Sequence, residues 1–176
     1  MKFAVAGVLL FNVGILTASD KGSRGERQDK SAEVIRNSLS ALGCRVVRYE
    51  VVPDVSEIIA ARLASWADEG GIDVILTTGG TGLSSRDVTP EATLSVVSRV
   101  VPGIAEAMRV QTLAKTPLAM LSRSVAGVRG KCLIINLPGS PRAVSECLEV
   151  VLPVIPHAVD IITGRVTEHQ PPGEAG

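Results

Sequence analysis

The chain has 176 residues, of which 45% are apolar and 20% are charged, so it can bury the core of one domain and is too apolar to be disordered. Its 18 Lys and Arg residues balance its 18 Asp and Glu residues without any dense basic block, which argues against a nucleic-acid or basic membrane-binding surface. With one Trp, one Tyr and two Phe residues, the core must be mainly aliphatic.

Apolar runs typical of buried strands alternate with helical patterns in the first half of the chain. Gly43 ends the first of these helices, and the glycines at 70 and 71 end the second. The polar segment DKGSRGERQD, which follows the first strand, is interpreted as a loop. Strands are predicted over residues 14–19, 44–52 and 73–78, and helices over residues 32–42 and 55–66.

Prolines and hydroxyl residues mark the helices of the second half. Pro90 is tolerated in the first turn of a helix, for which Thr89 is the expected N-cap. Ser140 is expected to cap the last helix, which Pro153 and Pro156 should kink. A further helix is predicted over residues 103–115, strands over residues 118–121 and 131–137, and the last helix over residues 141–163.

The two chain ends are interpreted separately. The N-terminal segment MKFAVAGVLLFNVGILTAS has the outline of a weak signal peptide, but Asn12 interrupts its apolar stretch, and cleavage near Ala18 would remove the first strand. No run reaches the 18 or more apolar residues typical of a membrane span. A cytoplasmic protein is therefore expected, with residues 1–164 forming a single domain and residues 165–176 a disordered tail.

The three cysteines, Cys44, Cys132 and Cys147, are odd in number and lack the close spacing of a zinc knuckle or a redox pair. They are predicted to be buried core thiols of a protein in a reducing compartment.

The alternation of strands and helices predicts an α/β fold, with a mostly parallel sheet covered by helices on both faces in a Rossmann-like arrangement. Ligands of such sheets bind at the carboxyl ends of the strands. Three glycine-rich or polar segments follow predicted strands, namely SDKGSRG, GGTGLSSRD and LPGSP. A pocket built from these three loops is the expected site.

The glycine-rich segment TTGGTGLSSRDVTPEAT (77–93) has neither the spacing of a P-loop nor that of the dinucleotide-binding fingerprint. Gly79, Gly80 and Gly82 would let the backbone approach a ligand closely and turn its amides toward an anion, with Thr81 adding a hydroxyl group. A phosphate-bearing ligand fits this chemistry. The alternative is a glycine turn that only joins a strand to a helix, and the spacing alone does not decide between the two.

Three separated segments resemble, in the same order, the MogA/MoaB family of molybdenum-cofactor biosynthesis proteins. They are GILTASDKGSRGERQD, TTGGTGLSSRDVTPEAT and AMLSRSVAGVRGKCLIINLPGSPRAVSECLE. The resemblance covers about residues 13–164, which is nearly the whole chain, and it is far more specific than a single glycine-rich loop.

The resemblance implies a three-layer α/β/α domain that forms a homotrimer or a hexamer. It implies an enzyme that uses Mg²⁺ to join the terminal phosphate of molybdopterin to the AMP part of ATP, releasing pyrophosphate. The family's catalytic, metal-binding aspartates match Asp87 in RDVTPE and Asp54 in VVPDV. The candidate substrate-binding residues in the matching loops are Ser19, Asp20, Ser23, Gly79, Gly80, Thr81, Gly82, Ser122, Ser124, Asn136, Pro138, Gly139 and Ser140.

These residues also have structural interpretations. Asp54 and Glu57 have the spacing of a capping box, so Asp54 could be a helix N-cap. Asp87 could pair with Arg86 or cap the turn that precedes the following helix. The remaining polar candidates could shape turns or satisfy backbone groups, which applies to Asp20, Ser23, Ser122, Ser124, Asn136 and Ser140.

The whole protein has alternative interpretations as well. In nucleotidyl transfer the attacking phosphate oxygen is already an anion, so two carboxylates that hold Mg²⁺ and a set of backbone donors would suffice. A hydrolase based on histidine is not supported, because His157 and His169 lie near a helix end and in the tail. A non-catalytic pterin-binding member or an oligomeric scaffold remains the alternative to the adenylyltransferase.

Overall fold

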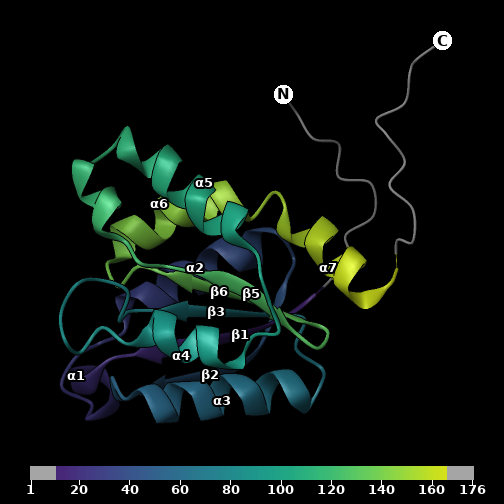
Figure 1. Cartoon of the computed structure of the whole chain (residues 1–176), viewed down its shortest axis with the longest axis horizontal. Helices are drawn as coiled ribbons and strands as arrows, with labels where there is room; N and C mark the ends of the chain where they lie inside the picture. The colour runs from purple at the N-terminus through teal and green to yellow at the C-terminus, as the bar shows by residue number, and fades with distance from the viewer. Residues whose placement is uncertain (1–10, 166–176) are drawn as a thin grey trace.

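Aliphatic segments form the centre of a six-stranded sheet in the computed structural model, which describes residues 11–165 (Figure 1). Nearly every residue of its three central strands is buried, as is typical of parallel sheets covered on both faces. The parallel strands are, in spatial order, β2 (Arg45–Val52), β1 (Asn12–Ala18), β3 (Val74–Thr78) and β6 (Cys132–Leu137). Beyond β6 lie β5 (Ala126–Arg129), which is antiparallel to both of its neighbours, and β4 (Arg99–Val100).

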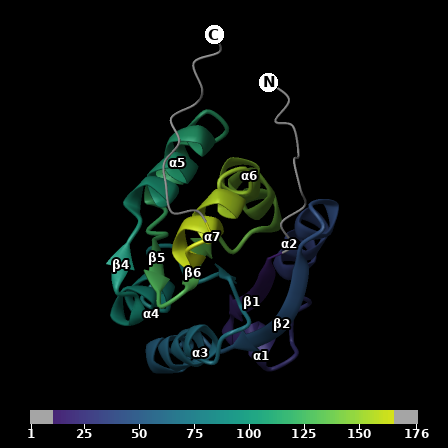
Figure 2. The same cartoon turned by 90° about the vertical axis from the view of Figure 1, so that its right-hand side faces the viewer.

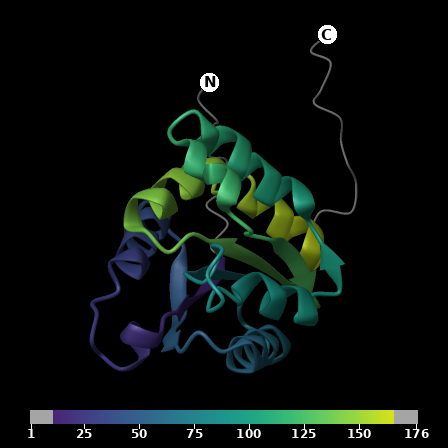
Figure 3. The same ribbon diagram turned by 60° about the vertical axis from the view of Figure 1, so that its left-hand side comes forward.

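Helices cover both faces of the sheet (Figures 2 and 3). Neighbouring strand residues point to opposite faces, so Ile15 belongs to one aliphatic core and Leu16 to the other. The first core is completed by α2 (Lys30–Ala41), α5 (Pro102–Leu113), α6 (Pro141–Val151) and α7 (Ile155–Thr163). The second is completed by α3 (Ser56–Asp68) and α4 (Thr89–Val96). The predicted α/β fold with three layers is therefore confirmed.

The segment 118–121 was expected to be a strand, and that prediction is wrong. It belongs to the 3-10 helix η1 (Pro117–Leu121), which begins at Pro117 after Thr116 accepts a hydrogen bond from the backbone N–H of Leu118. Leu118 and Met120 are 68% and 65% exposed, so their apolar character does not reflect burial in a sheet.

Two short strands and one short helix were not predicted. The strand β5 contains Gly127, which weakens its strand pattern, but a Cβ at this position would lie 2.8 Å from the carbonyl oxygen of Arg99. This glycine therefore lets β4 and β5 approach each other. The polar segment after β1 was expected to be a loop, yet it contains the helix α1 (Asp20–Ser23), for which Ser19 is the N-cap.

The helix expected over residues 141–163 is two helices, α6 and α7, rather than one kinked helix. Pro156 lies in the first turn of α7, where its missing N–H is tolerated, and Gly164 ends this helix in the left-handed conformation at φ 75°. Arg165 then pairs with the carboxylates of Asp73 and Asp160. The rest of the expected tail, and the segment interpreted as a weak signal peptide up to residue 10, lie outside the described residues.

The cysteines partly follow the prediction. Cys132 and Cys147 are buried, and burial raises the pKa of their thiols to about 12 and about 11. Cys44 is only partly buried, so the prediction of a fully buried thiol is wrong there. Within residues 11–165, no helix is both long and apolar enough to cross a membrane.

Candidate functional site

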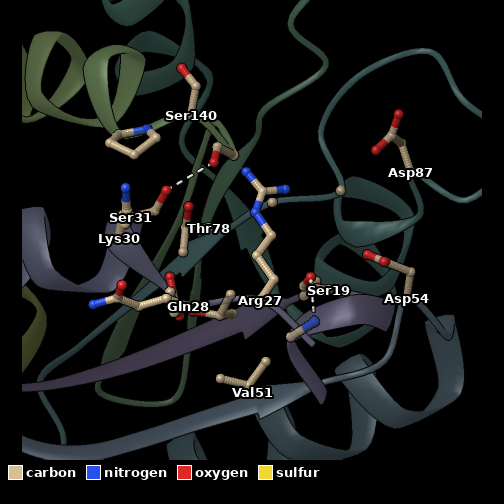
Figure 4. A pocket seen from close by; sticks show the side chains of 18 residues that line it. Ser19, Arg27, Gln28, Lys30, Ser31, Val51, Asp54, Thr78, Asp87 and Ser140 are labelled. Carbon is tan, nitrogen blue, oxygen red and sulfur yellow. Dashed lines mark hydrogen bonds between the residues drawn. The ribbon is translucent and has the colours of Figure 1, made fainter. Parts of the chain in front are cut away.

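The parallel strands end at one edge of the sheet, where the loops that follow them surround a cavity of about 700 Å³ (Figure 4). This is the position expected for a ligand site in a parallel sheet. The lining residues are Thr17, Ala18, Ser19, Gly22, Arg27, Gln28, Asp29, Lys30, Ser31, Val51, Asp54, Thr78, Gly79, Gly80, Asp87, Gly139, Ser140 and Pro141.

The glycine loop after β3 is held tightly against its neighbours. Gly79 and Gly80 have φ values of 91° and 65°, which favour glycine. A Cβ on Gly79 would lie 2.4 Å from the carbonyl oxygen of Ala18, and a Cβ on Gly80 would lie 2.4 Å from Thr89 Oγ1. The backbone of this loop therefore forms part of the cavity wall without side chains in between.

Thr89 has a different role from the predicted N-cap. It is the first residue of α4, whose N-cap is Val88 without a side-chain bond, so the prediction is wrong. The Thr89 hydroxyl instead donates a 2.9 Å hydrogen bond to the carbonyl oxygen of Gly79. The start of the helix thereby fixes the glycine loop.

Asp54 and Asp20 connect the loops after β1 and β2. The N–H of Asp20 donates to Asp54 Oδ2 at 2.8 Å, and the N–H of Asp54 donates to Asp20 Oδ1 at 3.0 Å. The capping-box interpretation of Asp54 is wrong, because Val55 is the N-cap of α3 and makes no side-chain cap bond. The carboxylate of Asp54 therefore binds the backbone at Asp20 and does not cap α3.

Arg86, from the loop after β3, joins this pair through two nitrogens, which donate to the Asp20 carboxylate at 2.9 to 3.1 Å. The N–H of Asp54 and the Arg86 guanidinium lower the pKa of Asp20. Burial raises the pKa of Asp54, and the negative charges of Asp20 and Asp87 add to that increase. The ionised form of Asp54 is thus destabilised by its surroundings, as is common for carboxylates at functional sites.

Asp87 lies in the same loop as Arg86 but does not pair with it. Its Oδ2 accepts a 2.8 Å hydrogen bond from the N–H of Ser84, whereas its Oδ1 accepts none from residues 11–165. Arg123 holds the loop from the other side, because its guanidinium donates to the carbonyl oxygens of Gly82 and Asp87 and pairs with Glu91. One carboxylate oxygen of Asp87 therefore remains free to bind a ligand.

The segment SRSVAG is held by Arg109, whose guanidinium donates to the carbonyl oxygens of Ser122 and Ser124 at 3.4 and 3.0 Å. The hydroxyl of Ser122 donates to that of Ser124. Asn136 is buried in β6 and donates to the hydroxyl groups of Thr77 and Thr93 at 3.0 and 2.9 Å. These three polar side chains satisfy groups within the protein.

The segment NLPGSP is fixed at three successive positions. Thr78 Oγ1 donates to the carbonyl oxygen of Pro138 at 2.7 Å, and Ser31 Oγ donates to that of Gly139 at 2.8 Å. Ser140 is the N-cap of α6, as predicted, and accepts a 3.2 Å hydrogen bond from the N–H of Ala143. The amino end of α6 is thereby placed at the cavity.

A family model described as "probable molybdopterin binding domain" matches residues 14–157. The chain belongs to the MogA/MoaB family. It is 46% identical to the molybdopterin adenylyltransferase of Helicobacter pylori strain J99, over 88% of this chain and 89% of the relative. It is 36% identical to the enzyme of the same name from Escherichia coli K12, over 90% and 89% of the two chains. The crystal structure of MoaB from Thermus thermophilus has a TM-score of 0.83 and 57% identity, covering 88% of this chain and 98% of that one.

The structure brings together about half of the residues that the MogA/MoaB resemblance suggested. Those that line the cavity are Ser19, Asp54, Gly79, Gly80, Asp87, Gly139 and Ser140. Those that do not line it are Asp20, Ser23, Thr81, Gly82, Ser122, Ser124, Asn136 and Pro138. A Cβ on Gly82 would lie 3.0 Å from Asp87 Oδ2, so this glycine makes room for the carboxylate.

Sequence reasoning named no candidate site residue around the start of α2. Arg27, Gln28 and Asp29, in the polar segment before this helix, line the cavity, and so do Lys30 and Ser31, its first two residues. A signal was present for one of them, since Asp29 precedes the helical pattern and accepts a 3.0 Å hydrogen bond from the N–H of Ala32 as an N-cap.

The donors in the cavity fit the Mg²⁺ ion that the family resemblance implies. Within the described part of the chain, no group of three or more His, Cys, Asp or Glu residues could hold a metal by itself. Asp54 and Asp87 are the pair of carboxylates on the same side of the cavity (Figure 4). Mg²⁺ is commonly held by one or two carboxylates together with the phosphates of a substrate, which is the kind of donor that Asp54 and Asp87 would provide.

Proposed function

We propose that this protein is a molybdopterin adenylyltransferase of molybdenum-cofactor biosynthesis. It transfers AMP from ATP to the terminal phosphate of molybdopterin in a reaction that requires Mg²⁺ and releases pyrophosphate. The observation that carries this proposal is the presence of Asp54 and Asp87 in one cavity, which is also lined by the glycine loop at Gly79 and Gly80. The 46% identity to a named molybdopterin adenylyltransferase supports it independently.

The residues of the cavity act by positioning and by balancing charge. The attacking phosphate oxygen is already an anion, so no general base is needed, and His157, on α7, lies outside the cavity. The backbone of Gly79 and Gly80, which lines the cavity, would lie against the phosphates, and the amino end of α6 would add a positive potential. Asp54 and Asp87 would hold Mg²⁺, which neutralises phosphate charge when bound.

We further propose that the chain assembles as a homotrimer through the α5–η1 surface, defined by Val110, Leu113, Leu118, Met120 and Leu121. These five apolar side chains are exposed in the single chain, and α5 and η1 contact each other. Exposed apolar groups gathered in this way are typical of subunit interfaces. The three free thiols fit a reducing compartment, and we place the protein in the cytoplasm.

The proposal is tested by incubating the purified protein with molybdopterin, ATP and Mg²⁺ and measuring both pyrophosphate and adenylyl-molybdopterin. We expect the two products in equal amounts and neither product when molybdopterin or Mg²⁺ is left out. Binding of molybdopterin without pyrophosphate release would contradict the proposed adenylyltransferase activity and favour the non-catalytic pterin-binding alternative.

A further inference from the structure

The cavity is lined by the carboxylates of Asp29, Asp54 and Asp87 and by the cations Arg27 and Lys30. Asp54 and Asp87 lie together on one side, whereas Lys30 lies on the other, and Arg27 extends into the space between them (Figure 4). The two cations come from the segment between α1 and α2 and from the first residue of α2. A ligand with more than one phosphate would therefore meet Asp54 and Asp87 on one side, Lys30 on the other and Arg27 between them.

The Arg27 guanidinium is unpaired although carboxylates line the same cavity. Among residues 11–165 it makes no hydrogen bond or ion pair, and this includes Asp29, Asp54 and Asp87. Arg24, three residues earlier, instead pairs with Glu26 at 2.7 Å and does not line the cavity. A guanidinium presents five donors in a planar fork that matches phosphate oxygens, and those of Arg27 are all available.

The wall beyond Arg27 also favours an anion. Gly139, Ser140 and Pro141 line the cavity at the amino end of α6, an eleven-residue helix whose dipole is positive there. Ser140 Oγ accepts the N–H of Ala143, and it makes no hydrogen bond with the Arg27 guanidinium among the described residues. A phosphoryl group between Arg27 and this helix end would be stabilised from both sides.

We propose that Arg27 binds a phosphoryl group of a substrate inside the cavity, in the space between Lys30 and the carboxylates of Asp54 and Asp87. The need for it follows from the proposed function, in which two phosphate-bearing anions must approach each other while the carboxylates add further negative charge. A metal held by Asp54 and Asp87 would offset part of this repulsion, and the Arg27 guanidinium offsets a further part within the cavity. Which substrate supplies the phosphoryl group rests on the proposed function, whereas the binding of phosphate does not.

The binding step is tested by calorimetric titration of the whole chain with pyrophosphate in the presence of EDTA, so that no metal contributes. We expect Arg27→Met to bind pyrophosphate about tenfold more weakly than wild type, because a charge-assisted fork is lost. Arg27→Lys, which keeps the charge without the fork, should lie between the two. Arg27 is exposed in a loop and has no partner within the described residues, so these variants should remain folded.

The matched control is Arg45→Met, which removes the same charge from the amino end of β2, at the end of that strand away from the cavity. It should bind pyrophosphate like wild type. Three results would overturn the proposal, namely a wild-type protein that does not bind pyrophosphate, an Arg27→Met variant that binds it normally, or equal losses in Arg27→Met and Arg45→Met.

Steady-state kinetics identify the source of the phosphoryl group. A rise in KM for ATP alone assigns Arg27 to the triphosphate, and a rise in KM for molybdopterin alone assigns it to the pterin phosphate. Unchanged KM values for both substrates, with kcat also unchanged, would contradict a role of Arg27 in the reaction. If the wild-type chain shows no adenylylation, the proposed function fails while the pyrophosphate titration still decides the role of Arg27.

Discussion

Replacing Asp87 by Asn removes a negative charge while almost preserving the shape of the side chain. The one hydrogen bond that its carboxylate accepts within residues 11–165, from the N–H of Ser84, can still be accepted by the amide oxygen of Asn. Complete loss of that bond would cost about 0.5–1.5 kcal/mol. We therefore expect the free energy of unfolding to stay within about 1 kcal/mol of wild type, and the melting temperature within about 4 °C.

The turnover of Asp87→Asn should fall much more. If the carboxylate holds Mg²⁺ against the reacting phosphates, its loss should lower kcat by roughly two to three powers of ten, or about 2.7–4 kcal/mol of transition-state stabilisation. Binding of molybdopterin should largely survive, because removing a carboxylate near a phosphate also relieves repulsion. Pyrophosphate release at saturating substrates measures the first effect, and direct titration with molybdopterin measures the second.

Asp68→Asn is the matched control. Asp68 carries the same side chain but pairs with Arg129 and lies outside the cavity, so its replacement should leave the turnover unchanged. The catalytic assignment of Asp87 would be refuted by an Asp87→Asn variant that melts like wild type and releases pyrophosphate at the wild-type rate. A lower melting temperature, with turnover reduced only in proportion to the folded fraction, would instead assign Asp87 to the fold.

Gly79→Ala should lower the free energy of unfolding, measured in urea, by about 2–4 kcal/mol. Alanine is strained at the left-handed φ of 91°, and its Cβ would lie 2.4 Å from a carbonyl oxygen. The control Gly103→Ala, whose Cβ would meet nothing within 4 Å, should be neutral or stabilising. Asp54→Asn should be more stable than wild type at pH 7. Because the pKa of Asp54 is raised in the folded protein, its contribution to stability is full below the ordinary pKa of 3.8 and is lost as the pH rises through the raised pKa. The melting temperatures of wild type and Asp54→Asn should therefore converge as the pH falls toward 3.8. Arg123→Met should lower kcat by about ten- to a hundredfold with little change in KM, and Arg123→Lys should recover part of it, because the guanidinium positions the loop that carries Asp87. Sedimentation at micromolar concentration should show a species three times the chain mass of 18.3 kDa, and a species of 18.3 kDa alone would contradict the trimer.

The central strands β1, β3 and β6 could be predicted because each is a mainly apolar run, and glycine or proline directly follows β3 and β6. The strand β5 could not, since it is only four residues long and includes Gly127. The segment from Pro117 to Leu121 was wrongly predicted as a strand because it is apolar without being buried. Its apolar side chains are exposed on the single chain, so apolar character there reports a surface feature and not a buried strand.

The site was predictable to the level of its loops but not of every side chain. The carboxyl ends of parallel strands meet at one edge, so loops that follow them in the sequence must gather there. Periodicity does not tell which residues of a polar loop point inward, and Arg27 was missed for this reason. The pairing of Asp20 with Asp54 could not be predicted either, because it joins residues 34 positions apart, one at the start of the unpredicted helix α1 and one in the loop after β2.

The position of β6 in the sheet has a consequence for biosynthesis of the chain. This strand is the last of the six in sequence, yet it lies between β3 and β5 in space. On the ribosome, β3 therefore keeps one unpaired edge while residues 79–131 are being made, and its aliphatic side chains remain partly uncovered. The cavity also needs Pro141 at the amino end of α6. A nascent chain that stalls before β6 thus has no complete cavity and offers an open strand edge to chaperones or to other unfinished chains.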